Sequence, residues 1–197
     1  MQFFTGDWDT DSKIMYNYLD KIKLSTKVRK NRNETIPINH YIGDNSGSSL
    51  WGLSWRWPCR NFTKVENVNH KGLYYTKCRE ENKHLYEIFK EYIGIYWKDI
   101  IFNELTQVQL NKNFRIPPHK DAQNVGDSLL VGFGDYLGGE INIKKDNEII
   151  THDIRDKGII FNGALYEHYV NDFTLLNNSN RYSMVIFNDK SLKKEKI

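Results

Sequence analysis

The sequence contains only two cysteines, Cys59 and Cys78, among its 197 residues. Two cysteines are too few for a disulfide scaffold or a zinc cluster, which favours a reducing, intracellular setting, cytoplasmic or nuclear. No run of about 18 apolar residues occurs, so no transmembrane helix and no membrane association are expected. The first residues, MQFFTGDWDTD, lack a basic segment followed by an apolar stretch, so a secretory signal is not expected either.

A strong excess of charge of one sign is also missing. With 28 Lys and Arg residues against 25 Asp and Glu residues, the formal net charge is only +3, so the protein is not basic as a whole. The positive charge is instead concentrated, because residues 21–32 contain six Lys or Arg and no acid. Such a patch can bind a polyanion such as DNA, with an affinity that falls steeply as salt rises. The alternative is a solvated loop.

Apolar and aromatic residues, by contrast, are abundant, at 39% and 14% of the chain. This composition excludes general disorder, and the length suffices for one domain with a substantial core. We predict a single domain over residues 1–197. Within it we expect an N-terminal helical and aromatic support region at 1–99, a β core at 100–189 and a basic tail at 190–197.

Two helices are expected in the N-terminal half. Apolar residues at helical spacing predict one that Asp9 or Asp11 caps and that ends near Lys23. The segment from Glu81 to Trp97 is the clearer helix, because its apolar residues recur at the i, i+3, i+4, i+7 spacing of a buried face. We expect that face to pack on a sheet and to carry no chemistry.

Three of the five tryptophans lie between Leu50 and Phe62, interleaved with arginines. Arg56 and Trp57 are candidate substrate-binding residues, as parts of an aromatic and cationic lid over a planar substrate. The alternative is that these tryptophans fill core space beside the β core.

From Ile100 onward, short β-rich runs alternate with turn signals. Hairpin turns are expected at Gly138-Gly139, Asp146-Asn147 and Asp156-Lys157-Gly158. Many short strands at this spacing predict an all-β core of jelly-roll or barrel type, flanked by the helices. The strands are expected near residues 104–111, 128–133, 139–144, 148–154, 158–162, 167–171 and 181–187.

A metal site is indicated by His119 and Asp121, which lie two residues apart and point to the same side of an extended backbone. His168, 47 residues after Asp121 and in a predicted strand, is the best third ligand. Two histidines and one carboxylate leave three metal positions open, as in the facial triad of non-haem Fe(II) oxygenases. We assign the metal-binding and catalytic role to these three residues. The alternative is a solvent-facing turn without metal.

A cosubstrate site is indicated thirteen residues after His168, where Arg181 and Ser183 alternate onto one face of a strand. A guanidinium group binds a carboxylate through two hydrogen bonds, and a hydroxyl adds another. The pair therefore suits the distal carboxylate of 2-oxoglutarate. Asn111, on the strand before His119, is a third candidate contact. The alternative for Arg181 is an ordinary salt bridge.

These motifs resemble those of the 2-oxoglutarate- and Fe(II)-dependent dioxygenases, and within them the TET and base-J-binding-protein group. The resemblance implies a double-stranded β-helix core, Fe(II) as metal, 2-oxoglutarate and O2 as cosubstrates, and ascorbate as a stimulant. It implies hydroxylation of a C–H bond with release of succinate and CO2. The matching residues are Pro118-His119-Lys120-Asp121, Asn124-Val125-Gly126-Asp127-Ser128, Phe133-Gly134-Asp135-Tyr136, Gly138-Gly139-Glu140, His168 and Arg181-x-Ser183.

In that group an Asn three residues after the ligand Asp contacts a flipped base, and Asn124 stands at this place. The resemblance therefore implies a 5-methylpyrimidine in DNA, 5-methylcytosine or thymine, as substrate and DNA as partner. Asn124 is also plausible as a turn residue. The cysteine-rich zinc region of TET enzymes and the DNA-binding module of base-J-binding proteins have no counterpart in the sequence. Three alternatives stay open: a protein hydroxylase (prolyl, lysyl or asparaginyl), a small-molecule oxygenase, or a non-catalytic nucleic-acid-binding module.

Overall fold

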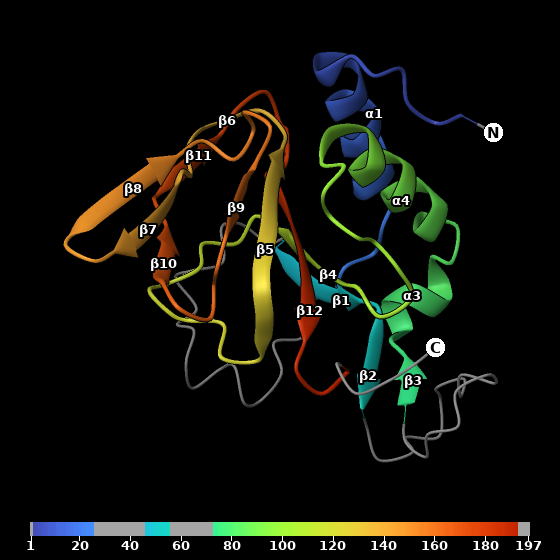
Figure 1. Cartoon of the computed structure of the whole chain (residues 1–197). Helices are drawn as coiled ribbons and strands as arrows, with labels where there is room; N and C mark the ends of the chain where they lie inside the picture. The colour runs from blue at the N-terminus through green and yellow to red at the C-terminus, as the bar shows by residue number, and fades with distance from the viewer. Residues whose placement is uncertain (1, 26–45, 56–72, 193–197) are drawn as a thin grey trace.

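The larger of two facing β-sheets has five strands in the order β1-β4-β12-β5-β9, and all neighbours are antiparallel (Figure 1). The computed structural model describes residues 2–25, 46–55 and 73–192. β1 comes from the predicted N-terminal support region and pairs with β4, so that region contributes a strand to the main sheet. The five strands are β1 (Gly47–Trp51), β4 (Gln107–Lys112), β5 (Asn124–Phe133), β9 (Ile159–Phe161) and β12 (Tyr182–Asp189).

The smaller sheet has the order β10-β7-β8, and an isolated antiparallel bridge between His119 and His168 extends it. Its strands are β7 (Ile141–Lys145), β8 (Glu148–His152) and β10 (Glu167–Val170). Two short ribbons pair β6 (Tyr136–Gly138) with β11 (Phe173–Leu175), and β2 (Leu53–Trp55) with β3 (Leu73–Tyr75). The two facing sheets with their flanking helices confirm the predicted jelly roll, a double-stranded β-helix.

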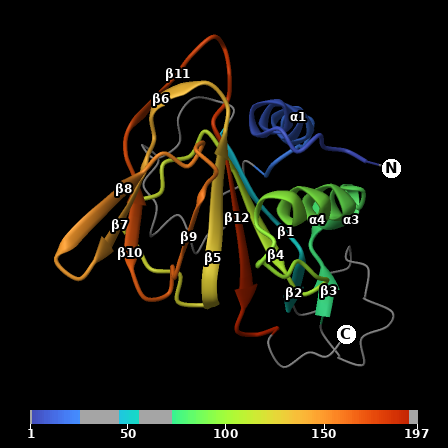
Figure 2. The same ribbon diagram turned by 45° about the horizontal axis from the view of Figure 1, so that its top comes forward.

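Helices α1 (Trp8–Asp20) and α4 (Leu85–Tyr96) cover the outer face of the five-stranded sheet, away from β7, β8 and β10 (Figures 1 and 2). α4 buries the face that the sequence predicts, against Leu129 and Val131 of β5 among others. The next residue, Leu130, belongs to the separate cluster between the two sheets. Successive strand residues thus alternate between the helix side and the inside of the β-helix. No helix in the described residues is long and apolar enough to cross a membrane.

The helix boundaries differ from the sequence predictions. Asp7 caps α1 by accepting from the Thr10 N–H at 2.9 Å, and α1 ends at Asp20, so capping by Asp9 or Asp11 was wrong. The predicted helix from Glu81 is two helices, because α3 (Lys77–Glu81) ends before α4 starts. The Asn82 side chain donates to the Cys78 carbonyl at 2.9 Å and ends α3.

Only one of the three predicted hairpin turns joins two paired strands. Asp146, at a positive φ of 55°, turns the chain between β7 and β8. Gly138 and Gly139, at φ values of 73° and 75°, instead carry the chain from the β6–β11 ribbon into the smaller sheet. Residues 156–158 likewise lead from β8 to β9, which belong to different sheets. The reason is topological: a double-stranded β-helix sends the chain repeatedly from one sheet to the other.

Trp51 is a core residue, with no exposed surface, and it packs edge-on to Phe89 at a centroid distance of 5.4 Å. This supports the core-filling interpretation at that position. Arg56, Trp57 and residues 26–32 of the basic segment lie outside the described residues.

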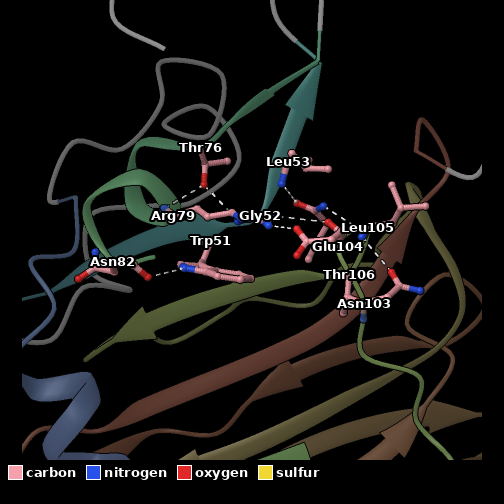
Figure 3. Close-up of polar contacts among 11 residues, drawn as sticks. Trp51, Gly52, Leu53, Thr76, Arg79, Asn82, Asn103, Glu104, Leu105 and Thr106 are labelled. Atoms are coloured by element: carbon pink, nitrogen blue, oxygen red, sulfur yellow. Dashed lines mark hydrogen bonds and ion pairs between the residues drawn. The ribbon is translucent and has the colours of Figure 1, made fainter. Parts of the chain in front are cut away.

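A set of polar contacts connects α3 and β2 of the N-terminal region to the segment just before β4 (Figure 3). Arg79 of α3 is 7% exposed, forms an ion pair with Glu104 just before β4, and donates to the Glu104 carbonyl at 3.2 Å. Its guanidinium also stacks on Trp51 and Tyr75, at 4.9 and 4.2 Å from the ring centroids. Arg79 therefore has a structural partner of opposite charge, Glu104.

Asp11 holds the N-terminal segment rather than capping α1. Its carboxylate accepts from the Thr5 N–H, the Gly6 N–H and the Tyr96 hydroxyl at 2.8, 2.8 and 2.6 Å. Burial raises the pKa of Asp11, but the hydrogen bonds from Tyr96, Thr5 and Gly6 outweigh it and lower the pKa below 3.8. The carboxylate therefore stabilises the fold above its usual pKa, and this contribution is lost as the pH falls through the lowered value.

We expect Asp11→Asn to reduce the free energy of unfolding by about 3 kcal/mol, because an amide group would face donors that need an acceptor. Urea unfolding measures the change. The exposed Asp9→Asn is the matched control and should stay within about 0.5 kcal/mol of the parent protein. Equal stability of the two variants at neutral pH would contradict the assigned role.

Candidate functional site

Two segments distant in sequence, residues 119–121 and 163–168, bring His119, Asp121 and His168 together. The backbones of His119 and His168 exchange two hydrogen bonds, at 3.1 and 2.9 Å, where the segment after β4 meets β10. The Asp121 N–H donates to the Gly163 carbonyl at 2.8 Å, which holds the Asp121 loop beside the segment between β9 and β10. A Cβ at Gly163 would lie 2.9 Å from Asp121 Oδ2, so a side chain there would crowd the site.

The side chains of these three residues converge, as the sequence predicts. One donor atom from each lies within 4.8 Å of the others. His119 Nε2 is 3.4 Å from Asp121 Oδ1, and His168 Nε2 is 3.6 Å from Asp121 Oδ2. Two imidazole nitrogens and one carboxylate at these separations form a donor set suited to a divalent transition metal.

Backbone carbonyls orient both imidazole rings. His119 Nδ1 lies 2.8 Å from the Pro117 carbonyl oxygen, and His168 Nδ1 lies 3.0 Å from that of Tyr166. A carbonyl oxygen can only accept, so Nδ1 carries the hydrogen in each neutral ring. The lone pair is then on Nε2, which faces Asp121. This is the outer-shell arrangement that holds metal-binding histidines in the correct tautomer.

The two histidines differ in their affinity for protons. Burial lowers the pKa of His168, and the nearby His119 lowers it further. Burial also lowers the pKa of His119, but the hydrogen bond and negative charge of Asp121 outweigh it, so this pKa is raised. The carboxylate that would bind a metal thus also attracts a proton to His119, and the two cations compete for the site.

Asn124, the candidate substrate contact, lies against Asp121 of the candidate metal-binding set. It is 7% exposed, and its side-chain amide donates to Asp121 Oδ2 at 3.2 Å and to Ser128 Oγ at 3.1 Å. The structure therefore brings Asn124 to the site and shows it orienting the Asp121 carboxylate.

We expect Asn124→Ala to weaken metal affinity about 10- to 100-fold, the usual effect of removing an outer-shell partner. Titration with Fe(II) under anaerobic conditions, or with Zn(II) in air, measures it. Gln123→Ala, at the exposed neighbouring position, should bind metal like the parent chain. An unchanged metal affinity in Asn124→Ala would show that the Asn124–Asp121 hydrogen bond has no such role.

The three predicted cosubstrate residues also lie together, on the inner face of the main sheet. Ser183 is opposite Asn111 in the β12–β4 pairing, and the Asn111 amide donates to Ser183 Oγ at 3.2 Å. Ser48 of β1 donates to Asn111 Oδ1 at 2.8 Å and extends this network. Tyr182 and Met184 belong to the helix-side cluster, so the alternating Arg181 and Ser183 face the inside.

Arg181 is a buried cation without an acidic partner among the described residues. It is 1% exposed, donates to the Gly139 carbonyl at 2.9 Å and lies 3.5 Å from that of Phe114. Its Nε has no hydrogen-bond partner within the described part of the chain. Burial lowers the pKa of Arg181. An uncompensated buried charge is expensive, so the site calls for an anionic ligand rather than the ordinary salt bridge considered above.

Sequence reasoning gave no role to two residues that complete the site. Gly163 has no local signal, because its closeness to Asp121 arises from the packing of two loops. Tyr136 lies in the Phe133-Gly134-Asp135-Tyr136 motif, but only the fold places its ring beside Arg181, 5.2 Å from the guanidinium carbon to the ring centroid.

No protein-family model matches the sequence, and a comparison with curated proteins found no match. Among solved structures, the chain is similar to NgTET1 in complex with 5mC DNA, with 17% identity over 84% of this chain and 67% of that chain, at a TM-score of 0.48. It is similar to a Pseudomonas putida prolyl-4-hydroxylase, with 11% identity over 95% and 89% of the two chains and a TM-score of 0.43. It is similar to JOX2 in complex with 2OG, Fe and JA, with 13% identity over 96% and 66% and a TM-score of 0.39.

These likenesses concern the fold. Within this double-stranded β-helix, the His-x-Asp…His donor set is of the facial-triad type that non-haem Fe(II) oxygenases use, and a buried arginine lies on the inner face of the main sheet.

Proposed function

We propose that the protein is an Fe(II)- and 2-oxoglutarate-dependent dioxygenase that hydroxylates a C–H bond of its substrate. The observation that carries the proposal is the convergence of His119, Asp121 and His168, with both Nε2 atoms facing one carboxylate. These residues would hold the metal on one face and leave the opposite face open. When bound, Fe(II) supplies the activation of O2.

In the balanced reaction, one oxygen atom of O2 enters the product hydroxyl and the other enters succinate, while 2-oxoglutarate loses CO2. The chain's own contribution to cosubstrate binding is Arg181, whose buried guanidinium needs an anion. Arg181 would bind the distal carboxylate, and Ser183 with Asn111 would complete the polar surface around it. The residues present therefore fit this cosubstrate.

We further propose a 5-methylpyrimidine in DNA, 5-methylcytosine or thymine, as the substrate. The support is the motif resemblance described above, together with the position of Asn124 in the turn that follows the ligand Asp121. In this proposal Asn124 contacts the base, and Arg56 and Trp57 belong to the substrate-binding surface. Residues 21–32 would contact the phosphate backbone. Extruding a base from the duplex costs a few kcal/mol, which such contacts would offset.

The test is incubation of methylated DNA with protein, Fe(II), 2-oxoglutarate, O2 and ascorbate, followed by digestion and mass spectrometry. We expect a hydroxymethyl base and an equal amount of succinate. DNA oligonucleotides that contain neither 5-methylcytosine nor thymine are the control. Succinate with oxidised peptide and no oxidised base in DNA or RNA would reject the DNA substrate and identify a protein hydroxylase. If no substrate class elicits Fe(II)-dependent succinate, the oxygenase proposal itself is rejected.

A further inference from the structure

We propose that β8 pairs edge to edge with β8 of a second copy of this chain, so that the protein forms a two-fold symmetric dimer. This inference goes beyond the proposed function and does not depend on it. β8 is the last strand of the smaller sheet, whose order is β10-β7-β8. The bridge between His119 and His168 extends the other end of that sheet, so β8 is its open edge in the described part of the chain. β8 also lies at the outer margin of the molecule, on the side away from α1 and α4 (Figures 1 and 2).

The edge of β8 lacks the features that usually prevent pairing between molecules. Natural edge strands are commonly short or carry lysine, proline or a bulge. β8 (Glu148–His152) has five residues in unbroken register with β7, and it contains neither lysine nor proline. Its centre is the β-branched run Ile149-Ile150-Thr151, in which the two isoleucines are 58% and 43% exposed. Adjacent exposed isoleucines on the two faces of an open strand are typical of an interaction surface.

The β7–β8 hairpin determines which backbone groups of β8 point outward. Lys145 and Glu148 flank the two-residue turn and are paired, so they exchange hydrogen bonds with each other. Hydrogen-bonded and non-hydrogen-bonded pairs then alternate along the two strands. The N–H and C=O groups of Ile150 therefore face β7, and those of Ile149 and Thr151 face outward. β8 thus offers two donors and two acceptors to another strand.

The sequence of β8 is complementary to itself in an antiparallel pair. A two-fold axis at Ile150 places Ile149 opposite Thr151 of the second copy, so the outward-facing groups of both strands are paired. Ile150 then contacts Ile150 of the second copy in a non-hydrogen-bonded pair, where Cα atoms are about 4.5 Å apart. Glu148 lies opposite His152 of the second copy, so a carboxylate meets an imidazole and no two acids face each other. The hydrogen bonds, the apolar surface and the charges all favour a second copy as the partner.

The dimer should be closed and weak. Two-fold pairing gives each copy the same interface and occupies the open edge of both smaller sheets, so assembly stops at two copies. Five-residue strands bury less than the standard interface of about 1,600 Å², so the dimer should dissociate on dilution. The metal-binding histidines lie at the other end of the smaller sheet, on β10 and beyond it, so metal binding should not depend on the dimer.

Sedimentation velocity of the full chain over a wide range of concentrations tests the proposal. We expect a monomer at low concentration and a dimer at high concentration. Ile149→Pro should raise the Kd of the dimer by about tenfold or more, because proline removes an outward-facing N–H from each copy and no hydrogen bond to β7. Ile150→Lys should abolish the dimer, because two ammonium groups would meet at the axis. The controls are Ile101→Lys and Ile160→Lys, which alter exposed isoleucines outside β8 and should leave the dimer unchanged.

A cysteine at the axis tests the register. Ile150→Cys should form an intermolecular disulfide on mild oxidation, because Cα atoms about 4.5 Å apart are within disulfide reach. Ile149→Cys is the matched control. Its counterpart in the second copy lies on the diagonal, about 7–8 Å away, so it should not cross-link. The parent protein, whose cysteines are Cys59 and Cys78, should not cross-link either.

A protein that stays monomeric at every concentration would overturn the proposal, and so would a dimer that survives both Ile149→Pro and Ile150→Lys. Cross-linking of Ile149→Cys in place of Ile150→Cys would overturn the register and the two-fold axis with it. The Fe(II) affinity of each variant should equal that of the parent protein, which shows that loss of the dimer does not come from unfolding. Failure of the oxygenase assay would leave the dimer standing, because β8 contributes no residue to the metal-binding set.

Discussion

His119→Ala will lose metal binding and turnover together. The substitution removes one of three donors whose atoms lie within 4.8 Å of one another, and Asp121 and His168 alone cannot hold the metal on three sides. The loss in turnover should exceed the roughly 100-fold that removal of an outer-shell partner causes. Anaerobic Fe(II) titration and succinate formation measure the two effects.

The matched control is His84→Ala, because His84 is exposed and lies at the start of α4, outside the donor set. It should bind metal and turn over like the parent protein. Circular dichroism and urea unfolding of His119→Ala should show an intact fold, since a third of the His119 side chain is exposed and the backbone bridge to His168 does not need the ring. A folded His119→Ala protein that retains full turnover would refute the ligand assignment.

Arg181→Ala will weaken 2-oxoglutarate binding about 100-fold, because truncating one partner of a buried charge pair costs roughly 2–5 kcal/mol. Metal affinity should stay unchanged, since the Arg181 guanidinium donates to the Gly139 and Phe114 carbonyls and not to a residue of the metal-binding donor set. Titration of the anaerobic Fe(II) protein with 2-oxoglutarate gives the Kd, and the KM for 2-oxoglutarate should rise with it.

Arg181→Lys is the informative companion variant. Lysine keeps the charge but loses the planar fork that binds a carboxylate through two hydrogen bonds. Its Kd should therefore lie between those of the parent protein and Arg181→Ala. The affinity of Arg181→Ala for 2-oxopentanoate should stay near that of the parent, because that acid has no distal carboxylate. If Arg181→Ala binds 2-oxoglutarate normally, the anion site lies elsewhere.

These two predictions separate the two halves of the proposed site. Loss of His119 affects the metal first and the cosubstrate through it, whereas loss of Arg181 affects the cosubstrate alone. Asn124 has two proposed roles. Its side-chain amide donates to the Asp121 carboxylate, and it is also the proposed contact to the base. The Asn124→Ala metal titration measures the first of these roles independently of any substrate.

Several features were predictable from the sequence because they depend on local geometry. His119 and Asp121 share a side because an extended backbone alternates its side chains, and Arg181 and Ser183 share one for the same reason. α4 follows from its helical spacing of apolar residues, and the β7–β8 hairpin follows from Asp146-Asn147, where Asp146 adopts a positive φ. In each case the interactions that determine the structure lie within a few residues of one another.

Other features were decided only by tertiary structure. Asp11 is not a helix cap because Tyr96, 85 residues away, donates to its carboxylate. Gly138-Gly139 is not a hairpin turn because the chain leaves one sheet there and enters the other. The sequence by itself determined which side chains could bind a metal and an oxo acid. The fold decided that His168 meets His119, that Arg181 is buried without an acid in the described residues, and that the Tyr136 ring lies beside the Arg181 guanidinium. The physical reason is that burial and the pairing of charges depend on contacts between distant segments, which no local pattern encodes.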